Sequence, residues 1–282
     1  MSDPYEADAD ADRAALRWAE QVYSAASDHF TRPALAFWDR YGEETVRRAA
    51  VAEGDHVLAR CCGAGASVVP ASRATGPSGR VVGVDIAEPQ VALARDRVAR
   101  EGLQNVELVR ADATATGYAD ESFDVVECVF GVFFVADMPA FVEEMWRMVR
   151  PGGRLAVTTW GPEVWEPGTG FFWGGVRRLR PDLVRSRNPW EEITTPEALE
   201  ELLARGGVPG AEVTAVAGRQ RLEAPEQFWD IVLGSGYRAT VEALDPSERD
   251  RLRDLVVDGL RRDGVLEVTT DVVVATSTKP SS

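Results

Sequence analysis

The chain makes its first strand-to-helix turn in the stretch VLARCCGAG, residues 57–65. Gly63 and Gly65 remove Cβ atoms where the backbone must turn tightly, so a ligand can approach the main chain closely. The amides at the start of the following helix, near Ser67, would point outward as hydrogen-bond donors. A Gly-x-Gly pair also fits a tight turn that binds nothing, so the surrounding pattern has to decide between the two interpretations.

Strand-like and helix-like segments alternate around this turn. Short β-branched runs at 81–84 and 106–110 alternate with helical patterns at 89–101 and 141–148. Such alternation predicts a parallel sheet. The runs lack strict polar alternation, as expected for strands that helices cover on both faces. We therefore predict an α/β fold with a doubly wound, mostly parallel sheet.

An acidic residue, Asp85, ends the second predicted strand, about twenty residues after Gly65. In doubly wound folds an acid at this place accepts hydrogen bonds from ribose hydroxyls. Asp85 would also fit as a cap or turn residue ahead of the helix that begins near Pro89. The agreement of spacing with strand order favours a nucleotide-binding role.

Further short motifs extend this pattern over roughly residues 38–160. They are GAG at 63–65, VDI at 84–86, RADA at 110–113, SFDVV at 122–126 and RPGGRL at 150–155. With these motifs the chain resembles class I methyltransferases that use S-adenosylmethionine (SAM), especially the bacterial small-molecule branch with the ubiquinone and menaquinone C-methyltransferases. The resemblance implies a Rossmann-like, seven-stranded sheet with an antiparallel edge strand, N-terminal helices and a helical lid. It also implies SAM as the cofactor.

The resemblance also implies roles for individual residues. Asp85 would hold the ribose, Asp112 with Ala113 would contact the adenine, and the backbone from Cys128 to Phe130 would border the methionine end of SAM. The implied cofactor-binding residues are Gly63, Ala64, Gly65, Asp85, Ile86, Asp112, Ala113 and Cys128.

The glycine loop departs from the family at two positions. The family begins this loop with an acidic residue and three alternating glycines, whereas this chain has Ala59 and Cys61. The acid ordinarily helps to organise the loop and the methionine ammonium. Two functions therefore stay open. One is methyl transfer to an O, N or C atom of a small apolar metabolite, in bacterial secondary metabolism. The other is a methyltransferase-like protein that no longer transfers methyl groups and acts as a binding module or non-methylating cyclase.

Aromatic residues follow the fourth and fifth predicted strands, at whose carboxyl ends ligands bind in open α/β sheets. They suggest an apolar acceptor, although lid packing explains any single one equally well. Methyl transfer gains most of its rate from orientation, and His29 is the histidine placed to act as a base; surface or helix packing fits it equally. The predicted substrate-binding residues are Phe130, Phe134, Trp160, Trp165 and Phe172.

The amino-acid composition limits the classes of partner and the cellular location that we expect for the protein. The 282 residues include 31 Lys and Arg against 46 Asp and Glu, a formal net charge of -15, which disfavours nucleic acid and anionic membranes as partners. The acidic, alanine-rich amino terminus predicts no signal peptide and a cytoplasmic protein. The three cysteines are too few for a disulfide framework or a zinc site, and the sequence does not indicate an oligomeric state. We expect a disordered leader over 1–15, a helical cap over 16–50, a SAM-binding core over 51–160, a substrate lid over 161–210, and the end of the sheet with inserted helices over 211–282.

Overall fold

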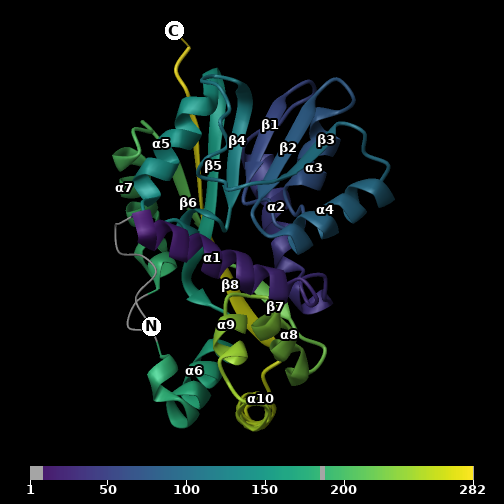
Figure 1. The fold of residues 1–282 in the computed structure, drawn as a ribbon, viewed down its shortest axis with the longest axis vertical. Helices are drawn as coiled ribbons and strands as arrows, with labels where there is room; N and C mark the ends of the chain where they lie inside the picture. The colour runs from purple at the N-terminus through teal and green to yellow at the C-terminus, as the bar shows by residue number, and fades with distance from the viewer. Residues whose placement is uncertain (1–8, 185–187, 282) are drawn as a thin grey trace.

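The protein is built around one twisted β-sheet with helices on both faces, and a computed structural model describes residues 9–184 and 188–281 (Figure 1). The strands follow the order β3-β2-β1-β4-β5-β8-β6, and the short β7 pairs with β8. The strands are β1 His56–Arg60, β2 Arg80–Asp85, β3 Val106–Arg110, β4 Phe123–Val129, β5 Val149–Val164, β6 Glu212–Val216, β7 Arg219–Arg221 and β8 Glu267–Thr278.

The pairing directions confirm the predicted Rossmann-like sheet. The strands β1 to β5 pair in parallel, and β8 runs antiparallel to both β5 and β6. The seven strands of the main path match the predicted number, whereas β7 is a short addition that the sequence pattern did not indicate.

Ten α-helices surround the sheet within the described residues. The helices α2, α3 and α4 cover one face, and α5 and α7 cover the other (Figure 1). They are α1 Ala9–Ala26, α2 Phe37–Arg48, α3 Val68–Thr75, α4 Glu88–Arg100, α5 Met138–Met148, α6 Gly168–Leu179, α7 Pro196–Arg205, α8 Phe228–Leu233, α9 Arg238–Glu242 and α10 Pro246–Arg262.

The remaining helices form a cap at the carboxyl ends of the strands. In Figure 1, α1 crosses below the sheet, and α6, α8, α9 and α10 lie beneath it. The helix α6 packs on α10, whereas α7 packs on α5 and β6. The lid expected over 161–210 is therefore wrong for its last part, because α7 belongs to the layer that covers the sheet. The cap takes its other helices from 228–262 instead.

The chain is helical earlier than the predicted leader allows. Of the leader expected over 1–15, residues 1–8 lie outside the described residues, and residues 9–15 are part of α1. This correction has a physical reason, since Ala15 is fully buried and α1 contacts α4 and α9. A helix that buries one face in this way is stabilised by packing rather than by its sequence propensity.

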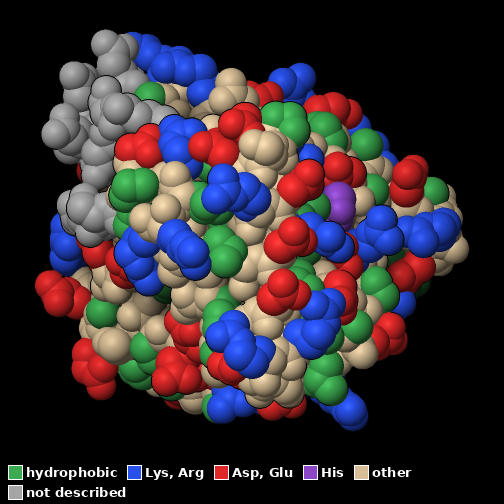
Figure 2. Space-filling view, turned by 90° about the horizontal axis from the view of Figure 1, so that it is seen from below, with side chains coloured by type: hydrophobic (Ala, Val, Ile, Leu, Met, Phe, Trp, Pro, Cys, Tyr) green, Lys and Arg blue, Asp and Glu red, His purple; other side chains and the backbone are tan. Residues whose placement is uncertain are grey.

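Two details concern the outer surface and membranes. The underside of the molecule, seen in Figure 2, shows acidic and basic side chains interspersed, with hydrophobic side chains scattered between them. In the part of the chain that the structure describes, no helix has both the length and the apolar character needed to cross a membrane.

One charged side chain is enclosed in the sheet. Arg60, the last residue of β1, is 1% exposed, and its three guanidinium nitrogens have no hydrogen-bond partner among the described residues. Its guanidinium carbon lies 4.2 Å from the ring centroid of Phe141 on α5, a cation–π contact. Burial lowers the pKa of Arg60.

Candidate functional site

A pocket, which we name the loop pocket, lies at the carboxyl ends of β1, β2 and β4. This is where open α/β sheets bind their ligands. Residues 61–67 form one wall, the ends of β2 and β4 form others, and α1 contributes Leu16, Ala19 and Tyr23. The remaining lining residues are Phe30, Trp38, Cys61, Cys62, Gly63, Ala64, Ala66, Ser67, Asp85, Ile86, Ala87, Gln90, Ala113, Thr114, Val129, Phe130, Phe134 and Val135.

The backbone of the loop alternates into the left-handed region. Cys61, Gly63 and Gly65 have φ angles of 54°, 49° and 83°. Glycine adopts these angles freely, whereas a residue with a Cβ atom is strained there. The alternating glycines of the family are therefore a backbone requirement, and Cys61 adopts the same conformation with a side chain attached.

Asp85 ends β2 and holds the loop in place. One carboxylate oxygen accepts a hydrogen bond of 2.8 Å from the Gly63 amide, and the other accepts one of 2.9 Å from the Ala87 amide. Burial raises the pKa of the Asp85 carboxyl, and these amides oppose the rise. Because each oxygen has a second lone pair, Asp85 can still accept a hydroxyl in the pocket that it lines. Its turn-forming and ligand-facing roles are thus compatible.

The other predicted cofactor residues divide into two groups. Gly63, Ala64, Ile86 and Ala113 line the loop pocket. The other three, Gly65, Asp112 and Cys128, are not among its lining residues.

Each of these three has a structural place beside the pocket. The Asp112 carboxylate accepts hydrogen bonds of 2.7 Å from the amide and the hydroxyl of Thr114, which fixes the turn behind Ala113. Cys128 is fully buried in β4. Gly65 serves close packing, because a Cβ atom there would lie 3.3 Å from the Ala94 Cβ atom on α4. Any cofactor contact of these residues remains a prediction.

A second pocket, which we name the aromatic pocket, adjoins the first. The two share Tyr23, Trp38 and Phe134 as a common wall. The strand β5 continues beyond its last pair with β4, at Thr158, and carries Trp160 and Val164 into the aromatic pocket. The other lining residues are Trp18, Phe133, Trp165, Trp173, Asn188, Trp190, Gly236, Tyr237, Ala239 and Thr240.

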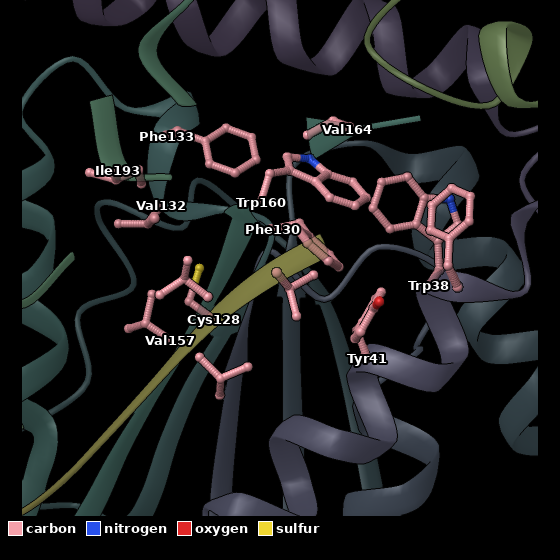
Figure 3. Packing of buried hydrophobic residues seen from close by; sticks show 14 of the residues in the cluster. Trp38, Tyr41, Cys128, Phe130, Val132, Phe133, Val157, Trp160, Val164 and Ile193 are labelled. Carbon is pink, nitrogen blue, oxygen red and sulfur yellow. The ribbon is translucent and has the colours of Figure 1, made fainter. Parts of the chain in front are cut away.

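The aromatic rings are packed against one another at the junction of the two pockets. The rings of Phe130 and Trp160 are stacked with centroids 4.1 Å apart, and Trp38 lies 5.4 Å from Trp160 (Figure 3). Six of the eight tryptophans in the chain line the aromatic pocket. This concentration makes the lining of the aromatic pocket rich in large aromatic faces.

Two predicted site residues lie elsewhere. Phe172 is completely buried and stacks on Tyr237 with centroids 4.7 Å apart, so it supports the pocket wall without lining it. His29 lines neither pocket, and its Nδ1 atom lies 2.6 Å from a carboxylate oxygen of Asp28. The prediction of a catalytic His29 is not supported by this position. By contrast, Phe134, Trp160 and Trp165 line the aromatic pocket, and their contact with an acceptor remains a prediction.

Sequence reasoning missed the contribution of Gln90 on α4. The side chain is buried, and its amide nitrogen donates a hydrogen bond of 3.1 Å to the Tyr23 carbonyl. Its Oε1 atom has no partner among the described residues and belongs to a pocket-lining side chain. A buried acceptor without a donor is costly, so a ligand hydroxyl or amine is its natural complement. The spacing of Gln90, five residues after Asp85, was the available signal.

Two indole N–H groups are also buried polar groups without a hydrogen-bond partner among the described residues. They belong to the Nε1 atoms of Trp38 and Trp165. Both side chains line the aromatic pocket, and Trp38 also lines the loop pocket. The sequence could not indicate Trp38, because an aromatic residue at helical spacing is usually part of a core.

The comparisons with known proteins agree with this geometry. Residues 34–164 match the ubiE/COQ5 methyltransferase family. A demethylmenaquinone methyltransferase of Listeria monocytogenes is 35% identical over 117 residues, which is 42% of this chain and 49% of the relative. The chain therefore spans about half the length of that relative.

Solved structures extend the likeness of the fold. A phosphoethanolamine N-methyltransferase 2 of Haemonchus contortus, solved with S-adenosyl-L-methionine, gives a TM-score of 0.58 at 17% identity and covers 95% of this chain and 60% of its own. The cyclase SpnF gives a TM-score of 0.53 at 19% identity, covering 86% and 81%. At such identities these two show the fold alone. Residues 34–164 thus match the model of the ubiE/COQ5 methyltransferase family, and the sheet order, the glycine loop and the solved structures agree on a class I methyltransferase fold.

Proposed function

We propose that this protein binds SAM in the loop pocket and transfers its methyl group to a small, neutral aromatic acceptor in the aromatic pocket. The observation that carries the proposal is the shared wall of the two pockets, formed by Tyr23, Trp38 and Phe134. Methyl transfer needs a nucleophile held in line with the methyl carbon, and orientation of this kind can supply about 7–11 kcal/mol of the barrier. Two adjoining sites provide it.

The loop pocket fits the nucleoside part of SAM. A Cβ atom on Gly63 would meet only Gln90 Oε1 and Phe30 Cζ, each at 4.0 Å, so the backbone there is open to close approach. Asp85 and the unpartnered Gln90 Oε1 atom would accept hydrogen bonds from ribose hydroxyls, and Ala113 would border the base. When bound, SAM supplies an electrophilic methyl group on a sulfonium.

The aromatic pocket restricts the acceptor by its chemistry. Within the described residues its lining contains no Asp, Glu, Lys, Arg or His side chain, which disfavours a charged acceptor. The free indole N–H groups of Trp38 and Trp165 would donate hydrogen bonds to carbonyl or hydroxyl oxygens of the acceptor. A flat aromatic compound with such oxygens fits, and the quinones implied by the name of the Listeria relative form one such class.

The lining also limits how the chain can assist the reaction. With no carboxylate or imidazole among the described residues of the aromatic pocket, a general base is not supplied there. The residues would act by stacking, by donating hydrogen bonds and by excluding water. An acceptor that is already nucleophilic, such as an electron-rich aromatic carbon or a phenolate, suits this arrangement.

The experiment is equilibrium binding followed by a transfer assay. Calorimetry should give a micromolar Kd for SAM, with competition by S-adenosylhomocysteine. Transfer of a labelled methyl group should then be measured with a panel of hydroxynaphthoquinones and phenols, and with matched carboxylated compounds as controls. No measurable SAM binding would overturn the proposal.

A non-methylating activity is the second candidate function. Ala59 and Cys61, the two departures in the glycine loop, favour it. A protein of this kind would bind the aromatic ligand with no methyl transfer at any SAM concentration. Tight SAM binding with transfer to even one panel member would exclude it.

A further inference from the structure

The sheet encloses one carboxylate that no part of the site described so far uses. Glu127 lies in β4 and is 0% exposed. Neither of its carboxylate oxygens has a contact of hydrogen-bond geometry among the described residues. A carboxylate without partners inside a protein costs several kcal/mol, so its presence calls for a function.

The register of the sheet places this carboxylate beside the position where the loop lacks its acid. Ala59 of β1 pairs with Glu127 on one side and with Gly83 of β2 on the other. Paired residues on adjacent parallel strands point to the same face, with the strands about 4.8 Å apart. The Ala59 methyl group and the Glu127 side chain therefore emerge side by side. Glutamate is one methylene longer than aspartate, so it can reach into the space beside it.

The polar groups that interact with this carboxylate line the loop pocket. Burial raises the pKa of Glu127 to about 7, and the neighbouring Ser67 hydroxyl opposes this rise. Ser67 is itself buried and lines the loop pocket just before α3. Burial first, and then nearby carboxylates that include Glu127, raise the pKa of Cys62 in the loop. Val129, two residues further along β4 and on the same face, also lines the pocket.

We propose that Glu127 supplies from β4 the carboxylate that Ala59 does not supply from β1, and that it acts as a positioning residue for the loop pocket. It does so through its electrostatic interaction with the neighbouring Ser67 hydroxyl, which favours the conformation of the 61–67 loop that receives the cofactor. The inference rests on the proposed function, because it concerns the affinity of that same pocket for SAM.

This arrangement predicts that the space accommodates one carboxylate and not two. Two carboxylates in a shared buried site cannot both ionise readily. Adding an acid at position 59 should therefore weaken SAM binding while Glu127 is present and strengthen SAM binding once Glu127 is removed. A merely structural role for Glu127 gives no such reversal.

The test is a set of four proteins: wild type, Glu127→Leu, Ala59→Asp, and the double variant with both changes. Calorimetry with SAM and with S-adenosylhomocysteine is the readout. We expect Glu127→Leu to weaken SAM binding by about tenfold or more and the double variant to return within about threefold of wild type. We expect Ala59→Asp alone to bind more weakly than wild type.

Two results would overturn the inference. One is an unchanged SAM affinity in folded Glu127→Leu, and the other is a double variant that binds no better than Glu127→Leu. If Glu127→Leu does not fold, the isosteric Glu127→Gln takes its place, and an affinity equal to wild type would be equally decisive.

A stability measurement separates this inference from the proposed function. If wild type binds no SAM, the proposed function fails, and urea denaturation of the same four proteins still tests whether positions 59 and 127 are coupled. Ala59→Asp should then destabilise the wild-type background clearly more than the Glu127→Leu background. Equal losses of stability in both backgrounds would overturn the inference that Glu127 replaces the acid missing at position 59.

Discussion

Glu127 should make the free energy of unfolding depend on pH in a way that the Glu127→Gln variant does not. Burial raises the pKa of this carboxyl from its ordinary 4.5 to about 7 in the folded chain. The folded state therefore holds a proton that the unfolded state releases, and stability falls as pH rises through this window. Each pKa unit corresponds to about 1.4 kcal/mol, so the full cost of ionising Glu127 is about 3 kcal/mol.

The assay is urea denaturation of both proteins without ligand, at several pH values from about 5 to 8. Every other titratable group is common to the two proteins, and the Cys62 thiol that faces Glu127 keeps a pKa well above this range. From about pH 5 to about pH 8, the wild type should lose about 2–3 kcal/mol of unfolding free energy relative to Glu127→Gln.

Two outcomes would refute the reasoning. A difference that stays constant with pH would mean that solvent or a polar partner reaches the carboxylate in the folded state. A difference that shifts in favour of wild type with rising pH would mean that a cationic group stabilises the ionised form. Either result would show that Glu127 is not an unpaired buried carboxylate, which is the observation from which its role beside Ala59 was inferred.

Four further predictions concern single side chains. Cys61→Gly should raise stability by up to about 1 kcal/mol in thermal melts by relieving the left-handed strain, whereas Cys61→Ala should not. Asp85→Ala should weaken SAM binding by about 1.5–3 kcal/mol in calorimetry, and an unchanged affinity in the folded variant would remove it from the site. Trp160→Ala should raise the acceptor KM more than it changes SAM affinity, whereas Phe172→Ala should chiefly lower stability, by about 3–5 kcal/mol, in urea titrations. Arg60→Met should leave stability unchanged or raise it by up to about 4 kcal/mol, because it removes an unpaired buried charge; a clear loss would show that the cation–π contact dominates.

The sheet could be predicted from the sequence because buried parallel strands leave a direct signature. Runs such as 81–84 are apolar on both faces, and helical patterns separate them at regular intervals. The division of the lid could not be predicted in this way. The amphipathic pattern at 196–205 requires one buried face, but it does not say whether α7 buries that face against the sheet or against the cap.

The candidate site shows the same limit at the level of residues. Gly63 and Asp85 were found because their roles depend on local spacing after a strand. Phe30, Trp38 and Gln90 reach the loop pocket from the turn after α1, from α2 and from α4, so only Gln90, five residues after Asp85, carried a local signal. Phe172 does not line the pocket, because consecutive residues on a helix point about 100° apart, and α6 turns Phe172 into the core and Trp173 toward the aromatic pocket.

The two departures in the glycine loop carry different weight once the backbone is known. Position 61 needs a positive φ angle. Glycine adopts such an angle freely, whereas Cys61 adopts it at the cost of local strain. An acid is required for the position of its charge in space, which the chain can meet from any strand that faces the same volume. Ala59 and Glu127 are paired across β1 and β4, so a loss on one strand and a gain on the other can cancel. If the coupling between these two positions is found, Ala59 ceases to favour a non-methylating protein, and the case for that alternative would rest on Cys61 alone.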